Sequence, residues 1–370
     1  MNAVSELHNI LSHYFSWNKS RIDCLCKLIF AIITVQTVNL SSVAVVLHGK
    51  AQVASHYKRL QRFFGWLSRF QLDAQRLLFR LSLSALNLKK NSILYVAMDR
   101  TNWQFGMIHI NLLVVGVSYH GVNIPIVWTS LGKAGSSSSK ERIQLLKQFQ
   151  RILDGFPFVL TADREFTGKK WIAYLCKKQI PFVIRIKGNT FVRRPKCSHP
   201  IPAKDLFRQV KNKRQKVFQE PHEAFEVPVF IAAARNKKGE LLIVISNQFC
   251  GKSIKEYLKR WGIECLFSCL KSRGFNFEDT HMSEPKKISA LLFVLTIVLV
   301  WSMRAGVNRR KECPIAIATH GRKRMSVFRR GLEGLKRCIV NLVSNIHTLI
   351  DFINLLMPKN DSRYSCEKVF

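Results

Sequence analysis

Acidic residues are scarce in this sequence. It has 23 Asp and Glu against 59 Lys and Arg, which gives a formal net charge of +36. So large an excess of one sign repels itself and calls for an anionic partner. A membrane surface is one candidate. Nucleic acid is the other, and we favour it because basic side chains on its phosphates release condensed counterions, and because the charge is spread along the chain rather than gathered in a tail.

The cysteines lack metal-binding spacing. The chain has 10 of them, but none forms a CxxC pair, and no histidine pair stands at zinc-finger spacing. This argues against a structural zinc site. The opening residues 1–17 are polar and interrupted, unlike a secretory signal, so we expect reduced thiols in a cytoplasm.

Long hydrophobic runs are also scarce. The exception is ISALLFVLTIVLVWSM at 288–303, which contains no charged residue. As a helix this run rises about 24 Å, short of the roughly 30 Å hydrocarbon core of a bilayer. A membrane span is the alternative, but we interpret the run as a helix buried inside a domain.

The remaining pattern predicts a helical region followed by an α/β region. Residues 1–85 carry apolar side chains at spacings of three and four, which predicts helices. From Asn91 the pattern changes to strands separated by helices. The expected strands are 92–98, 108–117, 122–128, 156–162 and 181–186, and the expected helices are 142–153, begun by a capping box of Ser138 and Glu141, and 168–178. This order predicts a mixed sheet covered by helices.

Later segments extend this plan. Residues 188–250 are basic and carry short alternating segments, which we interpret as a β-rich insertion rather than as core. Helices are expected at 255–271, at 288–303 and near 326–357. We find no internal repeat.

Two aspartates follow expected strands. Asp99 comes after SILYVAM and Asp163 comes after FPFVLTA. Ligand sites commonly lie where strands end at the carboxyl edge of a sheet. Either aspartate alone could be a turn or cap residue, but two in the same situation, in a chain with few acids, favour a shared site.

The segment YLKRWGIECLFSCLK at 257–271 carries a third acid. At about 100° per residue in one helix, Arg260, Glu264 and Lys271 lie within roughly 60° of Tyr257 on a single stripe. A surface salt-bridge ladder is the alternative, because Arg260 and Glu264 are four residues apart and such pairs add only a few tenths of a kcal/mol.

This stripe resembles a known signature. Tyr-x2-Arg-x3-Glu-x6-Lys is the motif of DDE transposases of the insertion-sequence-four family, and the chain matches all four positions at 257–271. The surroundings AMDRTNW at 97–103 and TADREF at 161–166, and the tail SRGFNFEDTH at 272–281, are also similar to that family. The resemblance covers about residues 50 to 340.

The resemblance implies an RNase H-like mixed-sheet catalytic core in which Asp99, Asp163 and Glu264 converge as catalytic residues and metal ligands. It divides the chain by function. The regions are a helical DNA-binding region at 1–88, a core at 89–187 and 251–310, the β-rich insertion at 188–250, and a helical C-terminal region at 311–370.

The cofactor implied is a pair of Mg²⁺ ions, with Mn²⁺ as a substitute. Hard cations prefer carboxylate oxygens, and two ions about 3.5 to 4 Å apart can stabilise both the attacking and the leaving oxygen of an in-line displacement. The reaction implied is cleavage of insertion-sequence ends and transfer of the freed 3′-hydroxyl strand to target DNA, without a covalent enzyme intermediate.

The resemblance also implies DNA contacts. Tyr257, Arg260 and Lys271 would hold phosphates near the cleaved end. Arg100 and Arg164 are further candidates, with salt bridges to nearby acids as the alternative. Two basic clusters complete the DNA-binding set, with a solvated helix face or loop as the alternative for each: Lys58, Arg59 and Arg62 in one, and Arg322, Lys323 and Arg324 in the other. Trp103, Trp171 and Trp261 are unranked candidates for stacking on a displaced base.

The expected partner is double-stranded DNA, both the terminal inverted repeats of the element and the target. We expect a homodimer in a synaptic complex to bind it, and we expect no membrane as a partner. The expected location is the bacterial cytoplasm, in association with the nucleoid. Two other functions stay open at this point. One is a metal-dependent nuclease or resolvase with the same core, and the other is a DNA-binding protein in which the acids serve only structure.

Overall fold

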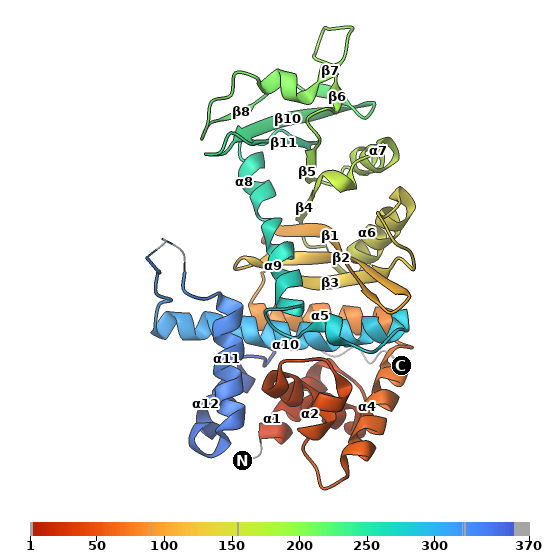
Figure 1. The fold of residues 1–370 in the computed structure, drawn as a ribbon. Helices are drawn as coiled ribbons and strands as arrows, with labels where there is room; N and C mark the ends of the chain where they lie inside the picture. Colours follow the sequence, from red (N-terminus) through yellow and green to blue (C-terminus); the bar gives the residue numbers. More distant parts are fainter. Residues whose placement is uncertain (1–2, 90, 154, 320, 322, 359–370) are drawn as a thin grey trace. The chain divides into compact units, whose positions relative to one another are not determined.

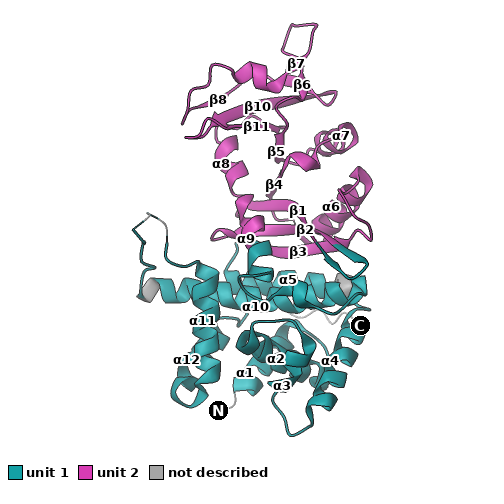
Figure 2. Cartoon of the chain, in the orientation of Figure 1, with its two compact units in different colours: residues 1–89, 103–110, 266–370 teal, residues 90–102, 111–265 magenta. Residues whose placement is uncertain are grey.

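The chain forms two compact units. The structure, a computed structural model, describes residues 3–89, 91–153, 155–319, 321 and 323–358 (Figure 1). Unit 1 comprises residues 1–89, 103–110 and 266–370, and unit 2 comprises residues 90–102 and 111–265 (Figure 2). These units follow spatial contacts, whereas the four regions expected from the sequence follow function and stay a prediction.

Unit 2 is built on a mixed sheet with the strand order β3-β2-β1-β4-β5-β11-β10-β8. β4 runs parallel to both β1 and β5, while β2 and β3 are antiparallel. The strands are β1 (Leu94–Phe105), β2 (Ile108–Tyr119), β3 (Val122–Ser130), β4 (Phe158–Ala162), β5 (Phe182–Ile186), β8 (Gln215–Val217), β10 (Val227–Arg235) and β11 (Leu241–Ser246). The predicted α/β fold class, a mixed sheet with flanking helices, is confirmed.

Two helices lie between the strands where the sequence predicts them. α6 (Ser139–Leu153) and α7 (Lys169–Lys177) pack beside each other (Figure 1). The capping box is present: the Glu141 amide donates to Ser138 Oγ at 3.3 Å, and Glu141 Oε2 accepts from the Ser138 amide at 2.6 Å. This reciprocal pair satisfies donors that the first helical turn leaves open.

The β-rich segment is part of the main sheet. β11 lies antiparallel to β5, with Ile243 opposite Ile186, and β10 pairs with β11 in turn. Smaller strands accompany this extension. β9 (His222–Ala224) pairs with β10, and β6 (Phe191–Val192) and β7 (Ile201–Pro202) form a separate two-stranded sheet. The β-rich segment therefore extends the main sheet, because β11 pairs with the free edge of β5, and its assignment as an insertion stays a prediction.

Unit 1 is helical, as predicted for residues 1–85. Its N-terminal helices are α1 (Ala3–Tyr14), α2 (Lys19–Val35), α3 (Leu40–Val45), α4 (Val53–Leu67) and α5 (Gln71–Leu86). The C-terminal helix expected near 326–357 is divided into α11 (Val327–Val340) and α12 (Leu342–Asn354).

α10 (Pro285–Glu312) contains the long apolar run. Among the described helices it alone has the length and hydropathy of a membrane span, over Pro285–Arg310, and 89% of its most apolar window is buried inside the protein. It packs against α5, α2, α4 and α11. Glycines set the closest approach: a Cβ on Gly331 would overlap the Ser302 carbonyl, and one on Gly306 would overlap the Val327 carbonyl. These contacts favour a core helix over a membrane span.

Candidate active site

The two aspartates are neighbours, one within β1 and the other directly after β4. Asp163 directly follows β4, as predicted. Asp99 does not follow a strand, because β1 continues to Phe105 next to β2, so that part of the prediction is wrong. The parallel register pairs Met98 with Ala162, which puts Asp99 and Asp163 at the next position of the two strands.

The segment that carries Glu264 is two helices rather than one. α8 (Ser253–Leu258) ends two residues before Arg260, and α9 (Trp261–Leu270) begins after a turn at Lys259 and Arg260. The single helical stripe from Tyr257 to Lys271 is therefore wrong. The cause is tertiary. Contacts of Tyr257 and Arg260 with the sheet override the local preference for one continuous helix.

Tyr257 and Arg260 connect the three acids. Arg260 Nη1 lies 3.0 Å from Asp99 Oδ2, and Nη2 lies 2.5 Å from Glu264 Oε1. The Tyr257 hydroxyl donates to Asp163 Oδ1 at 3.1 Å. The structure thus brings together five of the predicted site residues, although by a different route from the predicted stripe.

Packing on the sheet fixes the position of Tyr257. Its ring is buried with Ile254 of α8 against Val183, Ala232 and Val244, which belong to β5, β10 and β11. Burial raises the pKa of Tyr257 to about 12, so the phenol stays protonated and can donate to Asp163. The extension of the sheet by β10 and β11 therefore supports one side of the acidic site.

The two aspartates are electrostatically different. Burial raises the pKa of Asp99 to about 6, although a backbone N–H and Arg260 oppose the shift. Burial alone would also raise the pKa of Asp163, but a backbone N–H, the guanidinium groups of Arg260 and Arg185, and a tyrosine hydroxyl together lower it. Asp163 is the acid held more firmly in its ionised form.

The donor chemistry suits a divalent cation, because three carboxylates offer hard oxygen ligands. However, no group of three or more His, Cys, Asp or Glu side chains within the described ranges stands ready to hold a metal ion. The Arg260 guanidinium bridges Asp99 and Glu264 instead. The three carboxylates are therefore suitable ligands for a divalent metal, but in this structure the Arg260 guanidinium neutralises two of them, Asp99 and Glu264.

Sequence reasoning missed Arg185 and Gly262. Arg185 Nη1 lies 3.5 Å from Asp163 Oδ1, and its only sequence signal is a cation in the otherwise apolar strand FVIRI. Gly262 lies at the start of α9, where a Cβ would overlap the side-chain oxygen of Asn123 on β3. Gly262 thus allows α9, with Glu264, to lie close to the sheet.

Arg142 is a third residue that the sequence did not reveal. This buried side chain of α6 donates to the Glu165 carbonyl at 3.0 Å, to the Thr167 carbonyl at 3.2 Å and to the Ser137 carbonyl at 2.6 Å. It holds the short helix η1 (Arg164–Phe166) that follows Asp163. Its role is to position the loop after β4.

The other predicted phosphate contacts have varied environments. Arg100 forms an ion pair with Glu165 at 2.8 Å, which is the alternative that the sequence left open. Arg164 is exposed. Lys271 belongs to unit 1, where it lies 2.7 Å from Glu278 Oε1 and faces the ring of Trp103.

The structure ranks the three tryptophans. Trp171 is fully buried and Trp103 is 9% exposed, so both pack in cores. Trp261, which directly follows Arg260, is 62% exposed. Of the three, only Trp261 exposes its ring to solvent.

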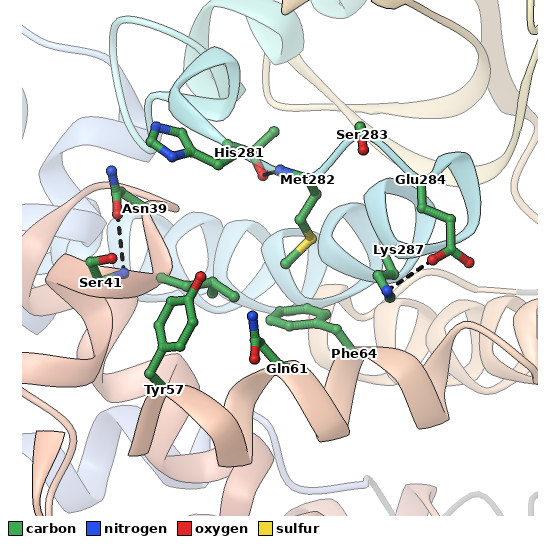
Figure 3. Close-up of a pocket in the computed structure, with 12 residues that line it drawn as sticks. Asn39, Ser41, Tyr57, Gln61, Phe64, His281, Met282, Ser283, Glu284 and Lys287 are labelled. Carbon is green, nitrogen blue, oxygen red and sulfur yellow. Dashed lines mark hydrogen bonds and ion pairs between the residues drawn. The ribbon is translucent and has the colours of Figure 1, made fainter. Parts of the chain in front are cut away.

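The first basic cluster lies on α4. Lys58 and Arg62 are exposed, whereas Arg59 is half-buried and pairs with Asp23 at 2.8 Å. Another side of the helix lines a pocket within unit 1 (Figure 3), to which Tyr57, Gln61 and Phe64 contribute. In the second cluster, Lys323 and Arg324 are exposed near a bridge between Ile317 and Lys323, while Arg322 lies outside the described residues.

Comparison with known proteins identifies the family. No curated protein matches the chain. Among solved structures, it is similar to a piggyBac transposase, seen by cryo-EM in a synaptic complex with hairpin DNA, at 11% identity and a TM-score of 0.43 over 99% of this chain and 85% of that chain. The transposase DDE domain matches residues 98–301, more than half of the 370 residues, and this range includes all three acids. The chain therefore belongs to the transposase DDE domain family.

Proposed function

We propose that this protein is a DNA transposase of the insertion-sequence-four family, which cuts the ends of its own element and joins the freed 3′-hydroxyl strands to target DNA. The observation that carries the proposal is the cluster of Asp99, Asp163 and Glu264 around Tyr257 and Arg260. Three of these five residues, Tyr257, Arg260 and Glu264, belong to the Tyr-Arg-Glu-Lys signature, and the other two are the aspartates that accompany it.

The three carboxylates would hold Mg²⁺, or Mn²⁺ in its place. Bound there, divalent ions supply activation of the attacking oxygen and stabilisation of the leaving oxygen. Asp163 suits this role most directly, because its lowered pKa keeps it ionised at neutral pH. A water molecule is the first nucleophile and the new 3′-hydroxyl is the second.

The cations at the site suit a phosphodiester substrate. The Arg260 guanidinium can form bidentate hydrogen bonds with phosphate oxygens, and Arg185 and the exposed Arg164 add positive charge beside Asp163. Trp261 is exposed next to Arg260 and is the candidate to stack on a displaced base.

The net charge of +36 supports double-stranded DNA as the partner. Lys58, Arg62, Lys323 and Arg324 are exposed and can reach phosphates outside the cleavage site. Because transposition joins two element ends to one target, we further propose that the protein acts as a homodimer in a synaptic complex, on nucleoid DNA in the bacterial cytoplasm.

A strand-transfer reaction tests this function. Purified protein would be incubated with Mg²⁺, a labelled duplex that carries the DNA ends flanking the gene, and a supercoiled target plasmid. We expect 3′-hydroxyl ends at the element boundary and their covalent joining to the plasmid. Cleavage without joining would identify a nuclease or resolvase instead, and binding without cleavage would identify a non-catalytic DNA-binding protein.

A further inference from the structure

Arg260 occupies an unusual position for a residue expected to bind DNA. Its side chain is only 8% exposed, and both of its terminal nitrogens contact acids, Asp99 at 3.0 Å and Glu264 at 2.5 Å. Its face also lies 5.6 Å from the Tyr257 ring. In this structure the guanidinium is directed toward the protein's own carboxylates.

The guanidinium is nevertheless not fully satisfied. Arg260 Nε is buried and has no hydrogen-bond partner within the described part of the chain. A buried donor without a partner carries a desolvation cost that the folded protein has not recovered. The two ion pairs offset the burial of the charge, because a buried cation is tolerated when acids surround it. The two ion pairs therefore hold Arg260 in place. A set of acceptors that also satisfied Nε would bind the guanidinium more favourably.

A phosphodiester offers such a set. Phosphate oxygens accept bidentate hydrogen bonds from a guanidinium, and these are among the strongest hydrogen bonds that arginine forms. A phosphate close to the site would compete with Asp99 and Glu264 for Arg260. The acids released in this way would be free to bind another cation.

We propose that Arg260 is a latch: it neutralises Asp99 and Glu264 in the free protein and leaves them when a DNA phosphate draws it away, so that metal binding depends on DNA binding. The latch rests on the proposed function, because it assumes that the same acids bind a divalent metal. By linkage the coupling is reciprocal, so that metal must strengthen DNA binding by the same factor. It would restrict cleavage chemistry to protein that is already on DNA.

The latch predicts a difference between variants in metal affinity, which can be measured without any turnover. Mn²⁺ binding would be followed by electron paramagnetic resonance, with and without a duplex of the terminal DNA that flanks the gene. We expect Arg260→Gln to bind Mn²⁺ about tenfold more tightly than the wild type when DNA is absent. Arg260→Lys keeps a cation and should be intermediate, which provides a second variant if the glutamine disturbs folding.

DNA should act differently on the variants. A phosphate that ligates the metal directly would raise the Mn²⁺ affinity equally in the wild type and in Arg260→Gln. Any additional increase in the wild type therefore measures the contribution of the latch. We expect DNA to raise Mn²⁺ affinity roughly tenfold more in the wild type than in Arg260→Gln. Arg193→Gln removes a cation of the same unit that pairs with Glu223, away from the three acids, and should behave as the wild type does.

The outcomes separate the two proposals. If Mn²⁺ binds but DNA raises its affinity equally in the wild type and in Arg260→Gln, the latch is overturned and the proposed function stands. If the wild type binds no Mn²⁺ with or without DNA, while the variants are folded, both the latch and the metal site of the proposed function are overturned.

Discussion

The acidic site of unit 2 and the basic segment of α4 in unit 1 handle charge in opposite ways. At the acidic site, Asp99 and Glu264 share a single buried cation, Arg260. On α4, Lys58 and Arg62 are exposed to solvent, and no ion pair of theirs occurs among the residues that the structure describes. Basic side chains are therefore buried against acids in one region and exposed, without an ion pair among the described residues, in the other.

This difference allows separate roles to be assigned to the buried and the exposed cations of a strongly basic chain. A buried, paired cation controls the geometry and protonation of its acids, so its loss should change chemistry and metal binding. An exposed, unpaired cation mainly attracts polyphosphate, so its loss should change affinity and salt dependence. The following predictions test whether the two regions separate in this way.

The largest expected effect is that of Glu264→Gln. The amide keeps the shape of the side chain but loses its charge, so we expect cleavage to fall on the order of 10³-fold or more, since a metal site contributes several kcal/mol. Binding of terminal DNA, measured by fluorescence anisotropy, should change little. Glu256→Gln on α8 is the matched control, because Glu256 contacts Tyr95 rather than the acids. Equal losses in the two variants would show that Glu264 has no special place in the site.

The next effect is on stability and depends on pH. The pKa of Asp99 is about 6 in the folded protein, above its ordinary value of 3.8, because of burial. The folded state therefore binds the proton more tightly than the unfolded state does, and this stabilisation is present at low pH and lost as pH rises through about 6. Asp99→Asn removes this dependence.

Urea unfolding of metal-free protein at several pH values measures this effect. Between about pH 4 and about pH 7.5, the wild type should lose up to about 3 kcal/mol of stability relative to Asp99→Asn. A constant difference across this range would mean that Asp99 is ionised as easily as an exposed aspartate.

Gly262→Ala tests the close approach of α9 to the sheet. The added Cβ would overlap the side chain of Asn123 and push Glu264 and Arg260 away from the aspartates. We expect a loss of about 10²-fold in cleavage, in line with the cost of an ångström-scale misplacement. The rate would be measured on pre-bound DNA.

Two companions make this prediction specific. Gly251→Ala is the control, because no atom lies within 4 Å of the added Cβ there. The double variant Gly262→Ala with Asn123→Ala should recover part of the lost activity. Full activity in the single variant would show that α9 does not need this contact.

The smallest effect is expected on α4. Replacing Lys58 and Arg62 together by Gln should lower the salt dependence of DNA binding by about 1.8 in the slope of log affinity against log salt, if each contacts one phosphate. Arg59→Gln is the control, because Arg59 pairs with Asp23. The cleavage rate of saturated complexes should not change. If Arg59→Gln changed the salt dependence of DNA binding more than the double replacement of Lys58 and Arg62, the assignment of DNA attraction to exposed cations would be contradicted.

The sequence predicts much of the fold because the elements carry local signals. The strands of the sheet, the capping box of Ser138 and Glu141, and the position of Asp163 at the end of β4 all follow from periodicity and turn residues. The convergence of the three acids came from the resemblance of their surroundings to a known signature.

What the sequence could not predict depends on tertiary contacts. The break between α8 and α9 lies where Arg260 contacts Asp99, which is 161 residues away in the sequence. Asp99 lies within β1 because β2 continues the pairing, and Arg185 reaches Asp163 only because β4 and β5 are neighbours. No local propensity encodes these arrangements.

The central claim is that Asp99, Asp163 and Glu264 form one metal site when DNA is bound. Iron-directed cleavage tests it directly: Fe²⁺ replaces Mg²⁺ in a complex with terminal DNA, and ascorbate with peroxide generates hydroxyl radicals that cut the nearby protein backbone. We predict cuts close to all three positions, which vanish with excess Mg²⁺ and weaken in Glu264→Gln. Cuts confined to other segments, or insensitive to Mg²⁺, would contradict the claim.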